Sequence, residues 1–155
     1  MYETEQKQRA QLVGVARSWL GTPYHAMGRV KGAGVDCLTL LAEIFHEAGI
    51  VPCIEIPYYP HDWHLHRGQE CYLTGLLQHT HEIYTPPQPG DIALWKFGRC
   101  FSHGAIVVAW PMIIHAYIGR ACVLENADSA RWLSHIGENA RDTGKIRPVR
   151  FFSVF

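Results

Sequence analysis

The sequence predicts an α+β fold in which N-terminal helices pack on an antiparallel β-sheet, and three observations support this prediction. The first half of the chain carries apolar residues at helical spacing. The second half carries short runs rich in Ile and Val that turn residues separate, which is typical of strands. Helices that precede strands in this way are typical of the α+β class. The length of 155 residues, 48% of them hydrophobic, suits a single domain over residues 1–155.

Two helices are predicted in the first third of the chain. Residues 4–20 have an apolar face at i, i+3, i+4 spacing, and Gly21 follows as a stop. A second helix begins at Asp36-Cys37, after a glycine-rich loop, and Gly49 stands where a C′ glycine belongs. The apolar face of this second helix consists of Leu40, Leu41, Ile44, Phe45 and Ala48.

The middle of the chain is predicted to be a surface loop followed by a short helix. Residues 51–68 contain three prolines, and we expect Tyr58, Tyr59 and Trp63 to pack this loop down, or alternatively to line a groove. A helix is predicted over 69–80. After Pro89-Gly90-Asp91 the periodicity becomes strand-like. Strands are predicted at 92–95, 105–110, 112–117, 120–124 and 146–151, with a short helix at 130–136.

Composition and charge exclude several classes of function. Lys plus Arg equals Asp plus Glu at 14 each, so we expect no nucleic-acid partner. The longest apolar run, residues 105–114, is interrupted by Pro111 and is too short to span a membrane. The polar N-terminus does not resemble a signal peptide, and five cysteines without a CxxC pair argue against a disulfide scaffold. We therefore expect synthesis in the cytoplasm.

Cys37 is the first candidate for chemistry. It begins a helix that Asp36 can cap, and the unpaired N–H groups and macrodipole at a helix N-terminus can lower the pKa of a thiol. The alternative is a buried structural cysteine, because free cysteine is among the most buried residue types. The remaining cysteines have no pattern of charged partners and are interpreted as structural: Cys53, Cys71, Cys100 and Cys122.

Two of the ten histidines belong to neighbouring predicted strands, because His103 opens one and His115 lies in the next. A turn near Trp110-Pro111 would pair the strands of His103 and His115 antiparallel and bring the two rings close together. A thiolate nucleophile needs a base and the base needs an orienting partner, and these two residues suit both roles. Two hydrogen-bonded core histidines remain the alternative interpretation.

Other histidines have spacings that a metal ion could use. His61, His64 and His66 lie close to Asp62, and His79 and His81 repeat the H-x-H spacing. Their segment is loop-like, so solvated histidines are the favoured interpretation. We expect neither a metal nor a cofactor.

Five short motifs occur in a specific order along the chain. They are Gly21-Thr22-Pro23-Tyr24, Gly34-Val35-Asp36-Cys37, Pro89-Gly90-Asp91, His103-Gly104-Ala105-Ile106-Val107 and Ile114-His115-Ala116. In order and spacing, across residues 9–118, the sequence resembles the NlpC/P60 cysteine peptidases. The segment at 58–63 and the short length are similar to the phage-type cell-wall peptidases that occur with tail genes of prophages and gene-transfer agents.

The resemblance implies a papain-like core and a role for each motif residue. Cys37 corresponds to the nucleophile, His103 to the general base and His115 to the residue that orients the base. Tyr24 corresponds to a tyrosine whose hydroxyl helps to stabilise the oxyanion, and Asp36 to a residue that contacts the amino group of the peptide. Many members follow the cysteine with Ser-Gly, whereas this chain has Leu38-Thr39, so substrate contacts of that serine are absent.

The activity implied by the resemblance is that of a peptidoglycan endopeptidase. It would cut the bond between D-γ-glutamate and the diamino acid of stem peptides, without a cofactor. The implied partners are stem peptides and phage-tail or gene-transfer-agent tail proteins, with delivery to the cell wall as a component of the particle. The alternatives are a papain-like acyltransferase or thioesterase, an N-acetylmuramoyl-L-alanine amidase, and a catalytically idle structural tail component.

Overall fold

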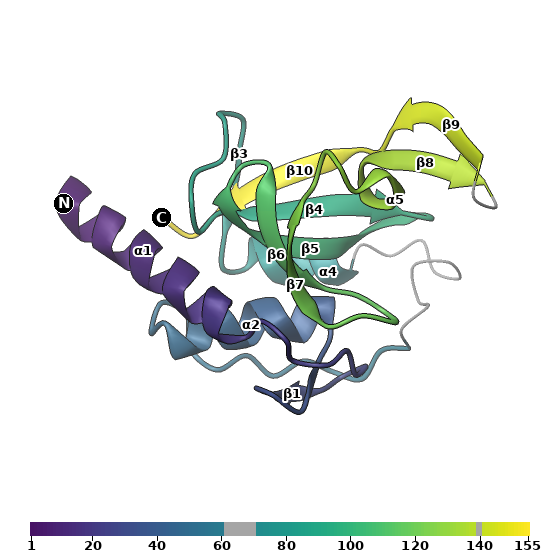
Figure 1. Cartoon of the computed structure of the whole chain (residues 1–155). Coiled ribbons are helices and arrows are strands. Elements are labelled where there is room, and N and C mark those ends of the chain that lie inside the picture. Colours follow the sequence, from purple (N-terminus) through teal and green to yellow (C-terminus); the bar gives the residue numbers. More distant parts are fainter. Residues whose placement is uncertain (61–70, 139–140) are drawn as a thin grey trace.

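The computed structural model describes residues 1–60, 71–138 and 141–155, and its centre is a six-stranded antiparallel sheet (Figure 1). The strand order is β3-β10-β4-β5-β6-β7. This arrangement confirms the α+β class and the antiparallel sheet that the sequence predicts. The strands are β3 (His81–Ile83), β4 (Ile92–Phe97), β5 (Cys100–Ala109), β6 (Met112–Ala116), β7 (Cys122–Asn126) and β10 (Val149–Ser153).

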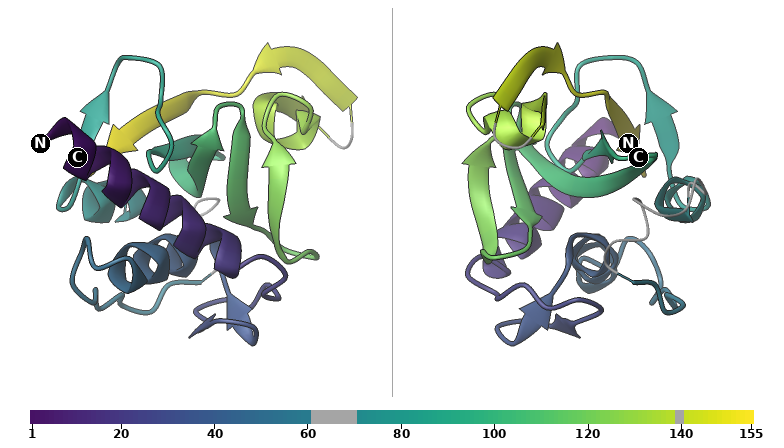
Figure 2. Two further views of the ribbon diagram at one scale, coloured as in Figure 1. Left: turned by 60° about the vertical axis from the view of Figure 1, so that its left-hand side comes forward. Right: turned by 90° about the vertical axis from the view of Figure 1, so that its right-hand side faces the viewer.

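Three helices lie along one side of the sheet, as two turned views also show (Figure 2). They are α1 (Tyr2–Ser18), α2 (Cys37–Glu47) and α4 (Cys71–Leu77). Successive side chains of a strand point to opposite faces, so alternate residues of β4, β5 and β6 meet these helices. The main core contains Leu12, Leu40, Ile44, Tyr72, Leu94, Ile106, Ile114 and Phe152.

A second, smaller core covers the opposite face of the sheet. There the intervening strand residues pack against α5 (Arg131–Ser134), and they include Ala93, Trp95, Ala105, Val107 and Ile113. The hairpin β8 (His135–Glu138) and β9 (Arg141–Ile146) follows α5 and was not predicted. Two short strands, β1 (Arg29–Val30) and β2 (Gly34–Val35), pair within the glycine-rich loop. In the described part of the chain, no helix combines the length and apolar composition that a membrane span needs.

Two predicted elements need correction. The helix predicted over 69–80 ends at Leu77, and residues 81–83, where no strand is predicted, form β3. The final strand predicted at 146–151 is observed as β10 from Val149 to Ser153, whereas Ile146 is the last residue of β9. Pro148 lacks an N–H for pairing, and the Arg147 guanidinium donates to the carbonyl oxygens of Leu133 (3.1 Å) and Lys96 (2.8 Å).

Candidate active site

A capping box at the start of α2 positions Cys37. The Asp36 carboxylate accepts the backbone N–H groups of Leu38 at 3.0 Å and Thr39 at 2.9 Å. In return, the Thr39 hydroxyl accepts the Asp36 N–H at 2.9 Å. The predicted cap is therefore confirmed. Thr39, which departs from the family pattern, is the residue that closes this box.

The second oxygen of Asp36 joins two neighbouring loops to the helix start. It accepts the Met27 N–H at 2.8 Å and the Tyr59 hydroxyl, and Asp36 is only 2% exposed. A carboxylate has about four acceptor sites, and donors from the chain itself already use both oxygens. The structure thus shows Asp36 as a cap and a loop anchor. Its contact with the amino group of a substrate stays a prediction.

The pKa of Cys37 differs from the one that the sequence predicts. Instead of being lowered, it is raised to about 12, chiefly because burial penalises the thiolate and secondly because of the Asp36 carboxylate. Backbone N–H groups of Gly104, Cys37 and Leu38 oppose this shift only in part. Cys37 is therefore a thiol near neutral pH, and it needs a base that removes its proton before it can attack.

The two strand histidines form a direct hydrogen bond. Ile106 of β5 pairs with Ile114 of β6, so continuing this register makes His103 and His115 diagonal neighbours on one face of the sheet. His103 Nε2 lies 2.8 Å from His115 Nδ1. This confirms that the two rings lie close together. The bond leaves His103 Nδ1 as the ring nitrogen for exchange of a proton with a thiol.

Glu125, which sequence reasoning missed, extends this chain of hydrogen bonds by one strand. His115 Nε2 lies 2.8 Å from Glu125 Oε2, and the His115 side chain is fully buried. Burial lowers the pKa of His115, Glu125 raises it in part, and Arg120 lowers it further. The strand predicted at 120–124 ended one residue too early to include Glu125. Glu125 lies two residues from Val123, which is opposite His115 in the strand pairing, so both side chains are on the same face of the sheet. This spacing is the signal from which Glu125 could have been found.

Aromatic rings surround the histidine pair, and the sequence indicated none of them. Trp132 stacks on His115 with ring centroids 5.7 Å apart and planes 14° apart, and its edge contacts His103. Phe97 contacts His103 edge-on at 5.8 Å, and Tyr117 lies beside His115 at 5.1 Å. These rings exclude water from the histidines and so strengthen the hydrogen bond between them.

A cleft of about 220 Å³ brings the predicted site residues together. Tyr24 lines it, and burial together with Cys37 and Asp36 raises the pKa of the Tyr24 hydroxyl, which therefore keeps its proton and can donate. His115 lies behind His103, away from this surface. The lining residues include Tyr24, Asp36, Cys37, Tyr59, Tyr72, Ser102, His103, Tyr117 and Trp132.

The remaining histidines do not form a described metal site. His61, His64 and His66, with Asp62 and Trp63, lie outside the described residues. His79 and His81 are described, and no three His, Cys, Asp or Glu side chains cluster as metal ligands would within the described ranges.

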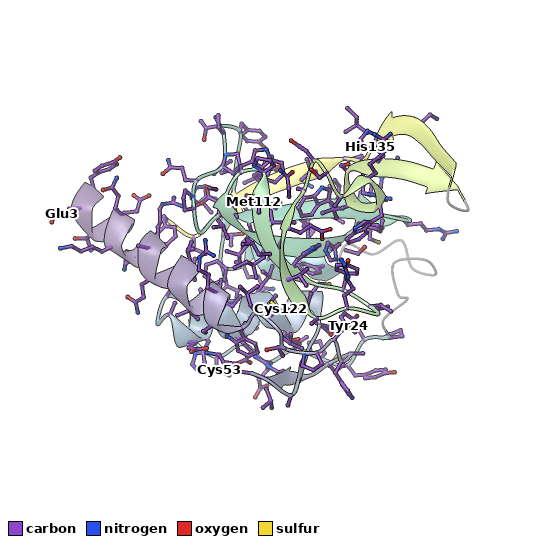
Figure 3. The ribbon with its side chains drawn as sticks, viewed as in Figure 1. Glu3, Tyr24, Cys53, Met112, Cys122 and His135 are labelled. Atoms are coloured by element: carbon purple, nitrogen blue, oxygen red, sulfur yellow. The ribbon has the colours of Figure 1, made fainter. Side chains whose placement is uncertain are left out.

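The surface loop and the cysteines bring two corrections. Tyr58 is 83% exposed and does not pack its loop down, whereas Tyr59 is half-buried. Cys53 is exposed on the loop after α2, so a structural role for it is wrong (Figure 3). Cys100 and Cys122 are buried in the core, in agreement with a structural role. The side chain of Cys71 is outside the described residues.

Gly104 leaves no room for a side chain beside the site. A Cβ at this position would collide with the Tyr72 hydroxyl and would lie 2.9 Å from Leu41 Cδ1. Tyr72 donates to the Cys37 carbonyl at 3.0 Å, so displacing it disturbs the start of α2. We expect Gly104→Ala to lower the free energy of unfolding by about 1–3 kcal/mol in urea denaturation.

The matched control is Gly14→Ala on α1, where a Cβ has nothing within 4 Å. Alanine is favoured over glycine inside a helix by roughly 0.5–1 kcal/mol, so this variant is expected to be slightly more stable than the wild type. Equal stability of the Gly104 variant and the wild type would contradict the steric argument.

No family model and no curated protein matches the sequence. Solved structures match the fold. The NlpC/p60 domain of the peptidoglycan hydrolase SagA has a TM-score of 0.57 and 19% identity, covering 79% of this chain and 92% of that one. NlpC2 from Trichomonas vaginalis has a TM-score of 0.56 and 15% identity, covering 94% of this chain and 45% of that one.

A third match is RipD from Mycobacterium tuberculosis, with a TM-score of 0.53 and 10% identity, covering 96% of this chain and 98% of that one. RipD is described as a non-catalytic NlpC/p60 domain protein adapted to peptidoglycan binding. These similarities confirm that the chain has the fold of NlpC/P60 domains. The chain spans less than half the length of the Trichomonas protein.

Proposed function

We propose that the protein is a cysteine hydrolase of peptidoglycan stem peptides. The observation that carries this proposal is the 2.8 Å bond between His103 and His115, behind a cleft that Cys37 and His103 both line. A half-buried thiol with a raised pKa is a poor nucleophile by itself, and the imidazole that lines the same cleft supplies the base that it lacks. The NlpC/P60 fold, which SagA shares, points to stem peptides as the substrate class.

In the proposed mechanism, His103 Nδ1 accepts the proton of the Cys37 thiol as the sulfur attacks the carbonyl carbon of the scissile bond. The Cys37 N–H and the Tyr24 hydroxyl donate to the developing oxyanion. The His103 imidazolium then returns the proton to the leaving amine, and the C–N bond breaks. A water molecule, deprotonated by His103, hydrolyses the thioester and restores the thiol.

The proposed scissile bond joins D-γ-glutamate to the diamino acid, meso-diaminopimelate or lysine. Mass spectrometry of a defined stem tetrapeptide is expected to show release of L-Ala-D-Glu by the wild type and no release by Cys37→Ala. The amino group of a free L-alanine would reach Asp36 at the cleft, where a charge-assisted hydrogen bond would set the register. With a muropeptide that still carries its sugar, cleavage only between the sugar and alanine would instead identify an amidase.

A specific observation supports a second candidate, acyl transfer or thioester hydrolysis on a lipid substrate. A mostly apolar cavity of about 700 Å³ lies between α2, residues 51–60 and α4, and it shares Leu38, Tyr59 and Tyr72 with the cleft. An acyl chain in that cavity would place its carbonyl near Cys37. This candidate would be favoured if the protein turned over long-chain acyl thioesters and did not cleave muropeptides.

The proposal extends to delivery by a phage tail or gene-transfer-agent tail, for which the resemblance of the motifs is the support. Proteomic analysis of purified particles tests for the chain. RipD is a non-catalytic protein of this fold, so a structural role is the corresponding alternative. A structural role would be established by two results: the chain is present in purified particles, and the wild type and Cys37→Ala release equal amounts of muropeptide.

A further inference from the structure

Glu125 is the third member of a row of polar side chains that crosses the sheet. His115 pairs with Val123 and Ile113 pairs with Glu125, so His115 and Glu125 are diagonal neighbours on the same face of β6 and β7. His103 occupies the corresponding diagonal position on β5. Each step has a 2.8 Å contact between polar atoms. Three adjacent strands therefore hold the row in a fixed register.

The chemistry of these groups determines where the protons lie. An ionised carboxylate only accepts hydrogen bonds, so the His115 Nε2 that faces Glu125 must carry a hydrogen. In a neutral imidazole the other nitrogen then has a lone pair, and His115 Nδ1 must accept the hydrogen of His103 Nε2. The remaining nitrogen of a neutral His103, Nδ1, carries a lone pair.

We propose that Glu125 is a positioning residue that selects these tautomers of His115 and His103, and so keeps His103 Nδ1 ready to accept the thiol proton. The catalytic consequence rests on the proposed function, whereas the tautomers themselves do not. Glu125 is not among the described residues that line the cleft and has no described contact with Cys37, so it acts through the two histidines.

The surroundings of His115 leave few other groups that could select its tautomer. The described titratable and charged groups that act on its ring are His103 on β5, Glu125 on β7, and Arg120 and Tyr117 near the end of β6. Neither Arg120 nor Tyr117 has a hydrogen bond to the ring among the described contacts, and Trp132 covers the ring by stacking. The carboxylate is therefore the acceptor that orders the row.

Long-range ¹H–¹⁵N correlation spectra of histidine-labelled protein test the proposal directly, because they distinguish protonated from bare ring nitrogens. Signals are assigned by comparison with His103→Ala and His115→Asn. Above neutral pH we expect wild-type His115 to have its hydrogen on Nε2 and a bare Nδ1, and His103 to have a bare Nδ1. Any other tautomer of His115 in the wild type would overturn the proposal, and this measurement needs neither substrate nor a Glu125 variant.

Removal of the Glu125 carboxylate, which accepts the hydrogen bond of His115, provides a second test. Glu125→Leu is expected to mix the two His115 tautomers and to lower kcat/KM by about 10- to 100-fold, mainly through kcat. Glu125→Gln, whose amide oxygen can still accept, is expected to restore part of the wild-type tautomer and activity. The matched control is Glu82→Leu, which removes a glutamate of similar side-chain exposure, 19% against 22%, from the Arg150 ion pair.

The control variant is expected to keep wild-type tautomers and activity, so that loss of an ion pair alone is excluded as the cause. A Glu125→Leu protein with wild-type spectra and unchanged kcat/KM would overturn the proposal. An inactive wild type with the expected tautomers would count against the proposed function and leave the role of Glu125 in place.

Discussion

His103→Ala is expected to lower the turnover of a stem peptide by about a thousandfold or more, because His103 supplies the imidazole among the described residues that line the cleft with Cys37. With the pKa of Cys37 raised to about 12, only a minute fraction is ionised at neutral pH without a partner. The steady-state rate with a defined tetrapeptide measures this loss.

His115→Asn and His115→Gln should retain measurable turnover, because an amide can still hold the His103 ring, and His115→Ala should be less active than either.

Alkylation gives a readout of the same base without a substrate. Iodoacetamide reacts with thiolates, so His103→Ala should slow the labelling of Cys37 at neutral pH. The exposed Cys53 serves as a control in the same molecule, and its labelling rate should stay constant. Mass spectrometry of tryptic peptides measures both rates. Wild-type rates at Cys37 in the His103 variant would show that the histidine is not its base.

Asp91→Ala is expected to lower the free energy of unfolding by about 3–5 kcal/mol, because it breaks a buried ion pair and leaves the Arg9 guanidinium with only the more exposed Glu5 carboxylate, also at 2.8 Å. Arg9 is 8% exposed and Asp91 is 1% exposed, and Arg9 Nη1 lies 2.8 Å from Asp91 Oδ1. The other Asp91 oxygen accepts the Gln88 N–H at 2.8 Å. The pair therefore joins α1 to the turn that precedes β4.

Urea denaturation measures this effect, and the pair Lys7–Glu3 on the same helix is the matched control. Its side chains are 77% and 82% exposed, so Glu3→Ala should change stability by less than about 1 kcal/mol. If both variants lost similar stability, burial would not be the source of the effect. The result also assigns Asp91, part of the Pro89-Gly90-Asp91 motif, to the fold rather than to catalysis.

The sequence alone determined the features that depend on local periodicity and on chemistry at chain positions. The helix that begins at Cys37 and its Asp36 cap follow from a capping residue before an apolar helical stripe. The α+β class follows from helical spacing before strand-like runs. The closeness of His103 and His115 follows from two strands joined by a short turn. Each of these depends on interactions between residues near in sequence, which a pattern can record.

Only the tertiary structure decided the features that depend on register between strands and on burial. Glu125 becomes a partner of His115 through a diagonal contact between β7 and β6. The strand predicted at 120–124 ends one residue before Glu125, so the sequence pattern did not include Glu125 in a strand. The pKa of Cys37 rises because the folded chain removes water from the thiol and places the Asp36 carboxylate nearby, and these effects exceed that of the backbone N–H groups around the sulfur. Side-chain partners and desolvation arise from contacts between distant segments, which local periodicity does not encode.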